Sequence, residues 1–189
     1  KRSLGGFNSI FAAASIESAK FYYAEFKRQM AEHPEKKLKI ALIYSFAANE
    51  AEPEDDFYDE NSESTEGLDE SSRDFLEEAI RDYNQEFRVN YDTQGFQDYY
   101  KDVSERLKNR ELDMLIVVNM FLTGFDATTL NTLWVDKNLR MHGLIQAFSR
   151  TNRILNSVKT FGNIVCFRNL EKATNEALSI FGNKEAGGI

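Results

Sequence analysis

The chain has 189 residues, of which 42% are hydrophobic and 13% aromatic, so it can form one domain with a substantial core. No apolar run approaches the ~18 residues that a membrane-spanning helix needs. The single cysteine, Cys166, excludes an internal disulfide and a cysteine-based zinc site, and a reducing, cytoplasmic setting follows. The chain opens on Lys1-Arg2-Ser3 without an initiator Met or a charged-then-apolar leader, which predicts a piece of a larger protein with no signal peptide.

The net charge of −8 is concentrated in one stretch. Residues 50–72 contain eleven Asp or Glu and no Lys or Arg, so the rest of the chain carries a net charge of +3. Low hydrophobicity and Pro53 predict a solvated loop or disordered insertion at 50–72. The mildly basic remainder permits a surface that follows a phosphate backbone.

The first predicted elements are an apolar strand at 8–14 and a helix at 16–32. Ser15 is a good N-cap for this helix, and Pro34 ends it. The next strand, 39–46, is apolar enough to be buried on both faces.

After the acidic stretch, hydrophobic periodicity predicts helices and strands in alternation. The predicted elements are helices at 73–87 and 95–110, strands at 113–119 and 132–135, a helix at 142–153, a strand at 162–167 and a helix at 170–181. This order predicts an α/β fold with an open, mostly parallel sheet and helices on both faces. In such folds, ligand-binding groups gather at the carboxyl ends of the strands.

The loop after the strand at 113–119 contains Thr123-Gly124-Phe125-Asp126. Gly124 lets the backbone approach a ligand closely, and Asp126 offers a carboxylate to a sugar hydroxyl or to an arginine. Taken alone, the same residues also suit a tight turn with a capping Asp.

The helix predicted at 142–153 carries a polar stripe, because residues three and four apart share a face. The stripe consists of Gln146, Ser149, Arg150 and Arg153. The opposite, apolar face consists of Leu144, Ile145 and Phe148. Two guanidinium groups aimed in one direction suit a polyphosphate, since each binds phosphate oxygens bidentately and stays charged. Such arginines accelerate phosphoryl transfer. The alternative is an exposed arginine pair in surface salt bridges.

The combination of these features within residues 113–153 resembles motifs V and VI of superfamily 2 helicases and translocases, and residues 7–27 resemble motif IV. Within that superfamily, residues 116–154 (IVVNMFLTGFDATTLNTLWVDKNLRMHGLIQAFSRTNRI) closely resemble the motor, or R, subunit of type I restriction–modification enzymes. The resemblance implies a second RecA-like motor domain over 1–189, with an acidic insertion at 50–72 and a helical segment at 73–110.

In such a subunit, motifs V and VI complete an ATP site shared with a preceding RecA-like domain. The complete enzyme is an ATP-dependent translocase of double-stranded DNA and an endonuclease, and it works with methyltransferase and specificity subunits. By position, Arg150 and Arg153 match the motif VI arginines that reach the γ-phosphate. Of the two, the resemblance favours Arg153 as the arginine finger. Gln146, Gly124 and Asp126 match nucleotide-binding positions.

The chain departs from the family pattern at two positions. The Thr that touches the nucleic-acid backbone in motif V is Val118 here, and the Gly before the first motif VI arginine is Ser149. The candidate DNA contacts are Asn119, Thr123 and Ser15.

No Gly-x-x-x-x-Gly-Lys-Ser/Thr occurs in the sequence, and Val135-Asp136 continues with Lys137 instead of a second acid. ATP and Mg²⁺ are therefore expected to bind mainly to an absent first motor domain, and the isolated chain is expected to be inactive. A non-catalytic RecA-like scaffold that binds DNA or partner subunits is the alternative, as is the same domain of another superfamily 2 helicase.

Four further residue types have plain structural interpretations. His142 is expected to cap or pack, Cys166 and Trp134 to lie in the core, and Tyr99 and Tyr100 to form a packing stripe instead of a base-stacking patch.

Overall fold

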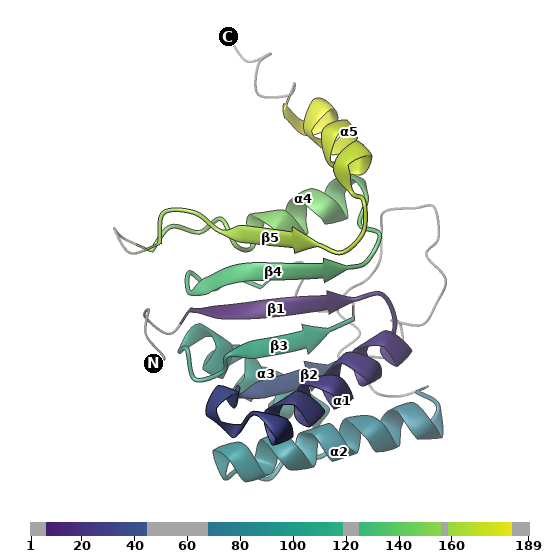
Figure 1. Ribbon diagram of the computed structural model, residues 1–189, viewed down its shortest axis with the longest axis vertical. Helices are drawn as coiled ribbons and strands as arrows, with labels where there is room; N and C mark the ends of the chain where they lie inside the picture. The colour runs from purple at the N-terminus through teal and green to yellow at the C-terminus, as the bar shows by residue number, and fades with distance from the viewer. Residues whose placement is uncertain (1–6, 45–67, 119–124, 156–158, 183–189) are drawn as a thin grey trace.

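The computed structural model describes residues 7–44, 68–118, 125–155 and 159–182, and Figure 1 shows them in colour. Within these residues five strands form one parallel sheet in the order β2-β3-β1-β4-β5. The strands are β1 (Asn8–Ala13), β2 (Ile40–Ile43), β3 (Met114–Val117), β4 (Leu130–Asp136) and β5 (Asn163–Cys166). The chain places β2 and β3 on one side of β1 and then β4 and β5 on the other.

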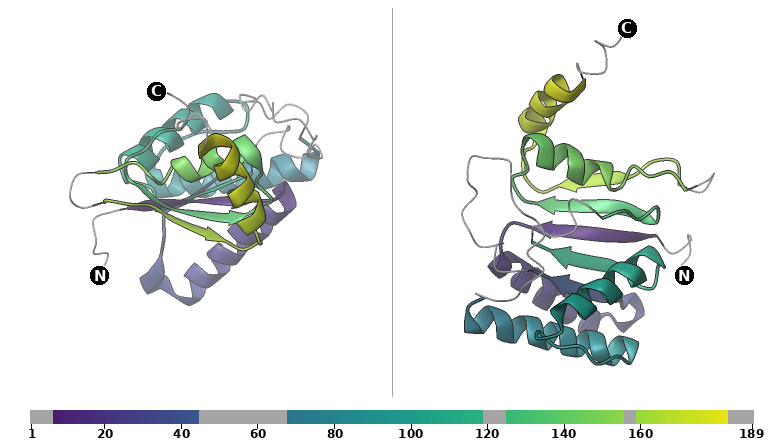
Figure 2. Two further views of the ribbon diagram at one scale, coloured as in Figure 1. Left: turned by 90° about the horizontal axis from the view of Figure 1, so that it is seen from above. Right: turned by 180° about the vertical axis from the view of Figure 1, so that it is seen from behind.

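Helices cover both faces of the sheet (Figures 1 and 2). The helices are α1 (Ile16–Glu32), α2 (Glu70–Phe87), α3 (Phe96–Lys108), α4 (Met141–Ser149) and α5 (Glu171–Gly182), with a short 3-10 turn, η1 (Pro34–Lys36). α1 lies on one face, α3 and α4 lie on the other, and α2 runs beside β2. The predicted α/β class with an open RecA-like parallel sheet is confirmed.

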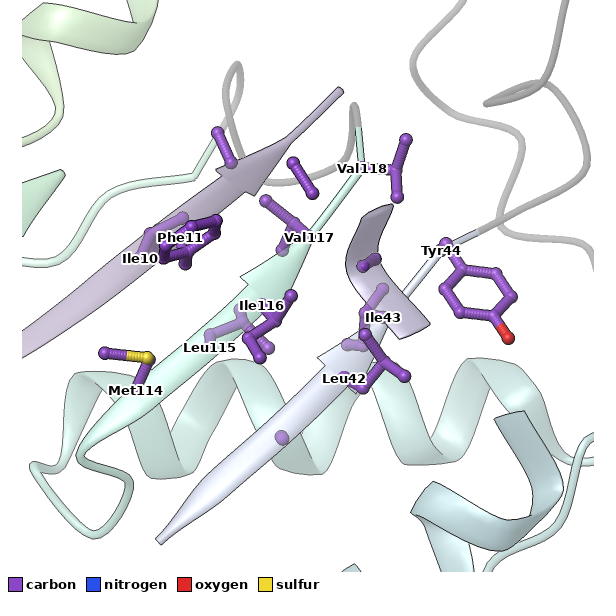
Figure 3. Close-up of a cluster of buried hydrophobic side chains, with 14 of the residues drawn as sticks. Ile10, Phe11, Leu42, Ile43, Tyr44, Met114, Leu115, Ile116, Val117 and Val118 are labelled. Carbon is purple, nitrogen blue, oxygen red and sulfur yellow. The ribbon is translucent and has the colours of Figure 1, made fainter. Parts of the chain in front are cut away.

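The core lies where the central strands meet the helices. Ile10, Leu42, Ile43, Leu115 and Ile116 are fully buried, and Figure 3 shows their side chains on the central strands. Strands that are apolar on both faces are typical of parallel sheets covered by helices, because neither face meets water.

α1 has the boundaries that the sequence predicts. The Ser15 hydroxyl accepts a hydrogen bond from the Ser18 amide at 3.2 Å, which satisfies one of the free N–H groups at the start of the helix. The helix ends at Glu32, and Pro34 begins the 3-10 turn that follows.

The end of the acidic stretch is helical, in contrast to the predicted loop. α2 begins at Glu70 because the Asp69 carboxylate caps it, accepting from the Ser72 amide at 2.9 Å and from the Ser72 hydroxyl at 2.7 Å. Leu68 and Ser72 are buried. Residues 50–67 lie outside the described part of the chain.

Tyr99 is fully buried, and Tyr100 packs against the core, so the predicted packing stripe is confirmed. Trp134 is half-buried against the core, and its ring stacks on Phe167 with centroids 6.4 Å apart.

Cys166 is exposed, so the prediction that it is a core residue is wrong. It lies on β5, and among the described strands β5 has a neighbour on one side only, which leaves its outer side open. His142 belongs to α4, but its side chain lies outside the described residues. None of the described helices is both long enough and apolar enough to cross a membrane.

Candidate functional site

The arginine segment begins where α4 ends. α4 stops at Ser149, and Arg150 is its C-cap. The Ser149 hydroxyl donates to the Gln146 carbonyl at 2.7 Å, and the Thr151 hydroxyl donates to the Phe148 carbonyl at 3.2 Å. These bonds satisfy carbonyls of the last turn that have no intrahelical donor. Arg153 therefore lies beyond the helix, and the prediction of one helical stripe through Arg153 is wrong.

Arg150 and Arg153 nevertheless meet the same loop. Arg150 Nη1 donates to the Phe125 carbonyl at 2.8 Å. Arg153 Nε lies 3.2 Å from Asp126 Oδ1, and the two side chains are 57% and 55% exposed. Two arginines near the end of one helix thus contact two consecutive residues of the predicted Gly-x-Asp loop. Gly124, Thr123 and Asn119 lie outside the described residues.

The environments of the two arginines differ. The bond from Arg150 is partly buried and ends on a backbone carbonyl, which fixes the guanidinium against the protein. The Arg153 pair is a single contact between two exposed groups, and such pairs hold their partners weakly in water. An incoming phosphate can therefore compete for Arg153 more readily than for Arg150. Gln146 is half-buried on α4 and lies one turn before Arg150.

Lys159 is part of this site although sequence reasoning did not identify it. Its side chain is buried, and its ammonium donates to the Thr151 carbonyl at 2.6 Å and to the Arg153 carbonyl. Burial lowers the pKa of the Lys159 ammonium. The backbones of Leu155 and Lys159 also bond to each other, with N···O distances of 3.0 and 3.2 Å. These contacts form only where the chain turns back on itself past α4, so no hydrophobic periodicity and no motif could reveal them.

Gly162 packs closely against Thr151, on the segment that carries Arg153. A Cβ added there would lie 2.2 Å from the Thr151 carbonyl oxygen. This close approach requires glycine, because any side chain would displace backbone. Gly162 directly precedes β5, so Thr151 lies at the amino end of that strand.

The site therefore lies at the amino-terminal edge of the sheet, opposite to the edge at which the sequence predicts ligand-binding groups. The Phe125 ring supports this placement, since it lies 5.4 Å from Nζ of Lys108. Lys108 ends α3, just before the amino end of β3. Figure 1 shows α4 running back from the arrowhead end of β4 towards the start of β5.

Ser15 lies at the other edge, between the carboxyl end of β1 and the start of α1. Its hydroxyl caps α1 and also lies 3.1 Å from the Ser18 hydroxyl. The structure thus separates this candidate DNA contact from the arginines by the length of the sheet.

Asp136, at the carboxyl end of β4, binds two neighbours. It accepts from the Tyr22 hydroxyl at 2.7 Å and from Arg168 Nε at 3.0 Å. The hydrogen bond to Asp136 is the main reason that the pKa of Tyr22 is raised. Within the described residues, no three His, Cys, Asp or Glu side chains gather as metal ligands.

The fold, and the contact between the Phe125–Asp126 loop and the arginines after α4, define the class of protein. It is an α/β protein with a RecA-like open sheet and an arginine-bearing edge. The family model for type I restriction enzyme subunit R domain 3 matches residues 5–169, and the chain belongs to this family.

Curated relatives agree with the family match. The chain is 43% identical over 179 residues to the endonuclease subunit of type I restriction enzyme SauCOLORF180P of Staphylococcus aureus (strain COL), covering 93% of this chain and 18% of the relative. It is 45% identical over 186 residues to the endonuclease subunit of SsaAORF53P of Staphylococcus saprophyticus, covering 95% of this chain and 18% of the relative. A third match, 62% identical over 65 residues, is to the putative MpnIIP endonuclease subunit N-terminal part of Mycoplasma pneumoniae, covering 34% of this chain and 17% of the relative. The chain thus spans less than a fifth of the length of these relatives.

Proposed function

We propose that this chain is the second motor domain of a type I restriction enzyme endonuclease subunit and supplies the arginine side of an ATP site. The observation that carries the proposal is the meeting of Arg150 and Arg153 with Phe125 and Asp126. The predicted motif V and motif VI residues are thereby adjacent, as a shared nucleotide site requires.

The position of the arginines supports a site shared with another domain. They lie at the amino-terminal edge, away from the carboxyl edge where a parallel sheet binds its own ligands. An exposed guanidinium at that edge is available to a nucleotide that a neighbouring domain holds. Arg153 is the proposed finger because more than half of its side chain is exposed, and Arg150 is the anchored partner. Gln146 and Asp126, with Gly124, are the proposed nucleotide contacts beside them.

The chemistry follows from the guanidinium group. Charge develops on the transferred γ-phosphoryl group during hydrolysis, and a correctly placed arginine stabilises it. ATP and Mg²⁺ are proposed to be held mainly by the preceding RecA-like domain, and the isolated chain is expected to hydrolyse ATP negligibly. The complete subunit is proposed to translocate double-stranded DNA, with methyltransferase and specificity subunits as partners in the cytoplasm.

DNA contacts are proposed at the opposite edge. Ser15 stands at the N-terminus of α1, where free N–H groups and the helix dipole favour a phosphate. Asn119 and Thr123 are further DNA contacts proposed on the basis of the family pattern.

The test is an Arg153→Ala variant of the complete subunit, numbered as in this chain. DNA-dependent ATP hydrolysis should fall by about 10³-fold or more, with ATP affinity within a few fold of the original, because the arginine acts on the transition state. Arg28→Ala is a matched control, since Arg28 is similarly exposed and ion-paired on α1, and it should hydrolyse ATP normally. Unchanged hydrolysis in Arg153→Ala would refute the finger role.

The exposed Arg153–Asp126 pair also suits a second function, a RecA-like scaffold in which the pair is a surface salt bridge. A scaffold predicts that Arg153→Ala leaves ATP hydrolysis intact while salt-sensitive binding of DNA or subunits persists. ATPase and DNA-binding assays on the same variant therefore separate the two functions.

A further inference from the structure

Lys159 is a buried cation whose hydrogen bonds end on backbone carbonyls. It is 3% exposed, and among the described residues no carboxylate lies within ion-pair distance of its ammonium. Its bonds go to two backbone carbonyls, those of Thr151 and Arg153. Burying an ammonium costs free energy that an apolar side chain of similar volume would not. Stability alone is therefore a poor account of why a lysine occupies this position.

The two carbonyls identify what the lysine holds. The Thr151 carbonyl belongs to the peptide plane before Asn152, and the Arg153 carbonyl belongs to the plane after Arg153. Holding both carbonyl oxygens restrains the backbone torsions of the two residues between them, Asn152 and Arg153. One ammonium group therefore restrains the direction in which the Arg153 side chain leaves the backbone.

The segment is also held from its other side. The Thr151 carbonyl oxygen that accepts from Lys159 is the atom that a Cβ at Gly162 would approach to 2.2 Å. The Leu155–Lys159 bridge keeps the lysine backbone beside the segment. Thr151 is thus enclosed between an ammonium and a glycine, and Arg153 follows two residues later with an exposed side chain.

We propose that Lys159 is a positioning residue for Arg153: by binding the Thr151 and Arg153 carbonyls it holds the arginine in the orientation that phosphoryl transfer needs. The proposal rests on the proposed function of Arg153. A buried lysine holds the turn past the end of α4 through two carbonyls, so the finger is oriented before the two motor domains close. Orientation that is set in advance need not be established during the reaction, and small misplacements of a reacting group cost large factors in rate.

The test uses Lys159→Met in the complete subunit, which preserves side-chain length and removes the ammonium. Hydrolysis per nucleotide-binding molecule should fall about 10- to 100-fold, with binding of a non-hydrolysable ATP analogue unchanged. Binding of ADP–aluminium fluoride, which mimics the transition state, should weaken by a similar factor relative to ADP. Gly162→Ala, which displaces the same carbonyl from the opposite side, should have the same signature. Ile80→Val, a core change in α2, is the control for lost stability. It should change neither the hydrolysis per nucleotide-binding molecule nor the affinity for ADP–aluminium fluoride relative to ADP.

A double-mutant cycle on ADP–aluminium fluoride affinity separates this proposal from the proposed function. If Lys159 acts through Arg153, adding Lys159→Met to Arg153→Ala causes no further loss. Normal transition-state affinity in Arg153→Ala would refute the finger role itself. If Arg153→Ala binds ADP–aluminium fluoride weakly relative to ADP, but Lys159→Met and Gly162→Ala both bind it normally, the positioning role alone is overturned. Fully additive losses in the double variant would also overturn it.

Discussion

Asp126→Asn separates the stabilising and functional roles of the Arg153–Asp126 pair. The substitution keeps the shape of the side chain and removes its charge. The pair is one contact at 3.2 Å between groups that are 57% and 55% exposed. Two unit charges at this distance attract by about 1 kcal/mol in water, and salt and the loss of side-chain freedom reduce the net value to ~0–1 kcal/mol. For a domain of this size the melting temperature should fall by less than about 4 °C.

The same change should lower ATP hydrolysis by the complete subunit about 10- to 100-fold, because Asp126 is a proposed nucleotide contact beside Arg153 and its carboxylate is lost. Hydrolysis is measured with saturating ATP and DNA, and melting by differential scanning calorimetry. Glu78→Gln is the matched control, since Glu78 forms a similarly exposed pair with Lys27 at 3.4 Å. It should change neither quantity appreciably.

Two results would contradict this reasoning. A loss of more than about 2 kcal/mol of unfolding free energy would mean that the pair stabilises the fold far more than an exposed pair can. Normal hydrolysis with normal stability would mean that the Asp126 carboxylate takes no part in the nucleotide site.

Three further predictions concern stability and DNA binding. Burial raises the pKa of four tyrosines above the ordinary value of 10. As the pH rises above 10, these tyrosines lose their protons in the unfolded state before they do so in the folded state. The free energy of unfolding, measured by urea unfolding, should therefore fall by about 1.4 kcal/mol per tyrosine per pH unit above pH 10. The four tyrosines are Tyr23, Tyr44, Tyr83 and Tyr99. Tyr83→Phe removes a 2.7 Å bond to Asp102 and should cost about 1–2 kcal/mol at neutral pH, with a shallower decline at alkaline pH; an equal cost at all pH values would contradict the assignment. Ser15→Ala should cost ~0.5–2 kcal/mol, whereas Ser15→Asp should keep the cap and weaken DNA binding by the complete subunit; unchanged binding would exclude a phosphate contact.

Elements whose signals are local could be predicted from the sequence. α1 is marked by Ser15 at its start and Pro34 after its end, and both act through bonds within a few residues. β3 is a continuous apolar run, which a buried parallel strand requires. The predicted start of α2 lies three residues after the observed one. In the sequence Asp69 looks like one more acidic residue of the 50–72 stretch, although its carboxylate caps the helix.

Features that depend on distant contacts could not be predicted in the same way. The polar spacing of Gln146, Arg150 and Arg153 continues the helical period, yet α4 ends at Ser149. Past that point the carbonyls of Thr151 and Arg153 bind Lys159, a contact that forms only when the chain turns back. The apolar composition of β5 indicates a strand, but whether a strand lies at the edge of a sheet depends on the order of all strands.

The opposite placement of Ser15 and Arg153 bears on how such a domain could couple ATP to DNA. Ser15 follows the carboxyl end of β1, while Arg153 lies beside the amino ends of β4 and β5. β1 and β4 are adjacent and paired, with one register shift between Asn8 and Ser9. Ile10, Ala12, Leu133 and Val135 between the two edges are fully buried. A close-packed sheet of this kind moves as a unit, because its interior has no room to deform continuously. Movement of the arginine edge towards a nucleotide on a neighbouring domain would therefore displace the Ser15 edge as well, without any rearrangement inside this domain.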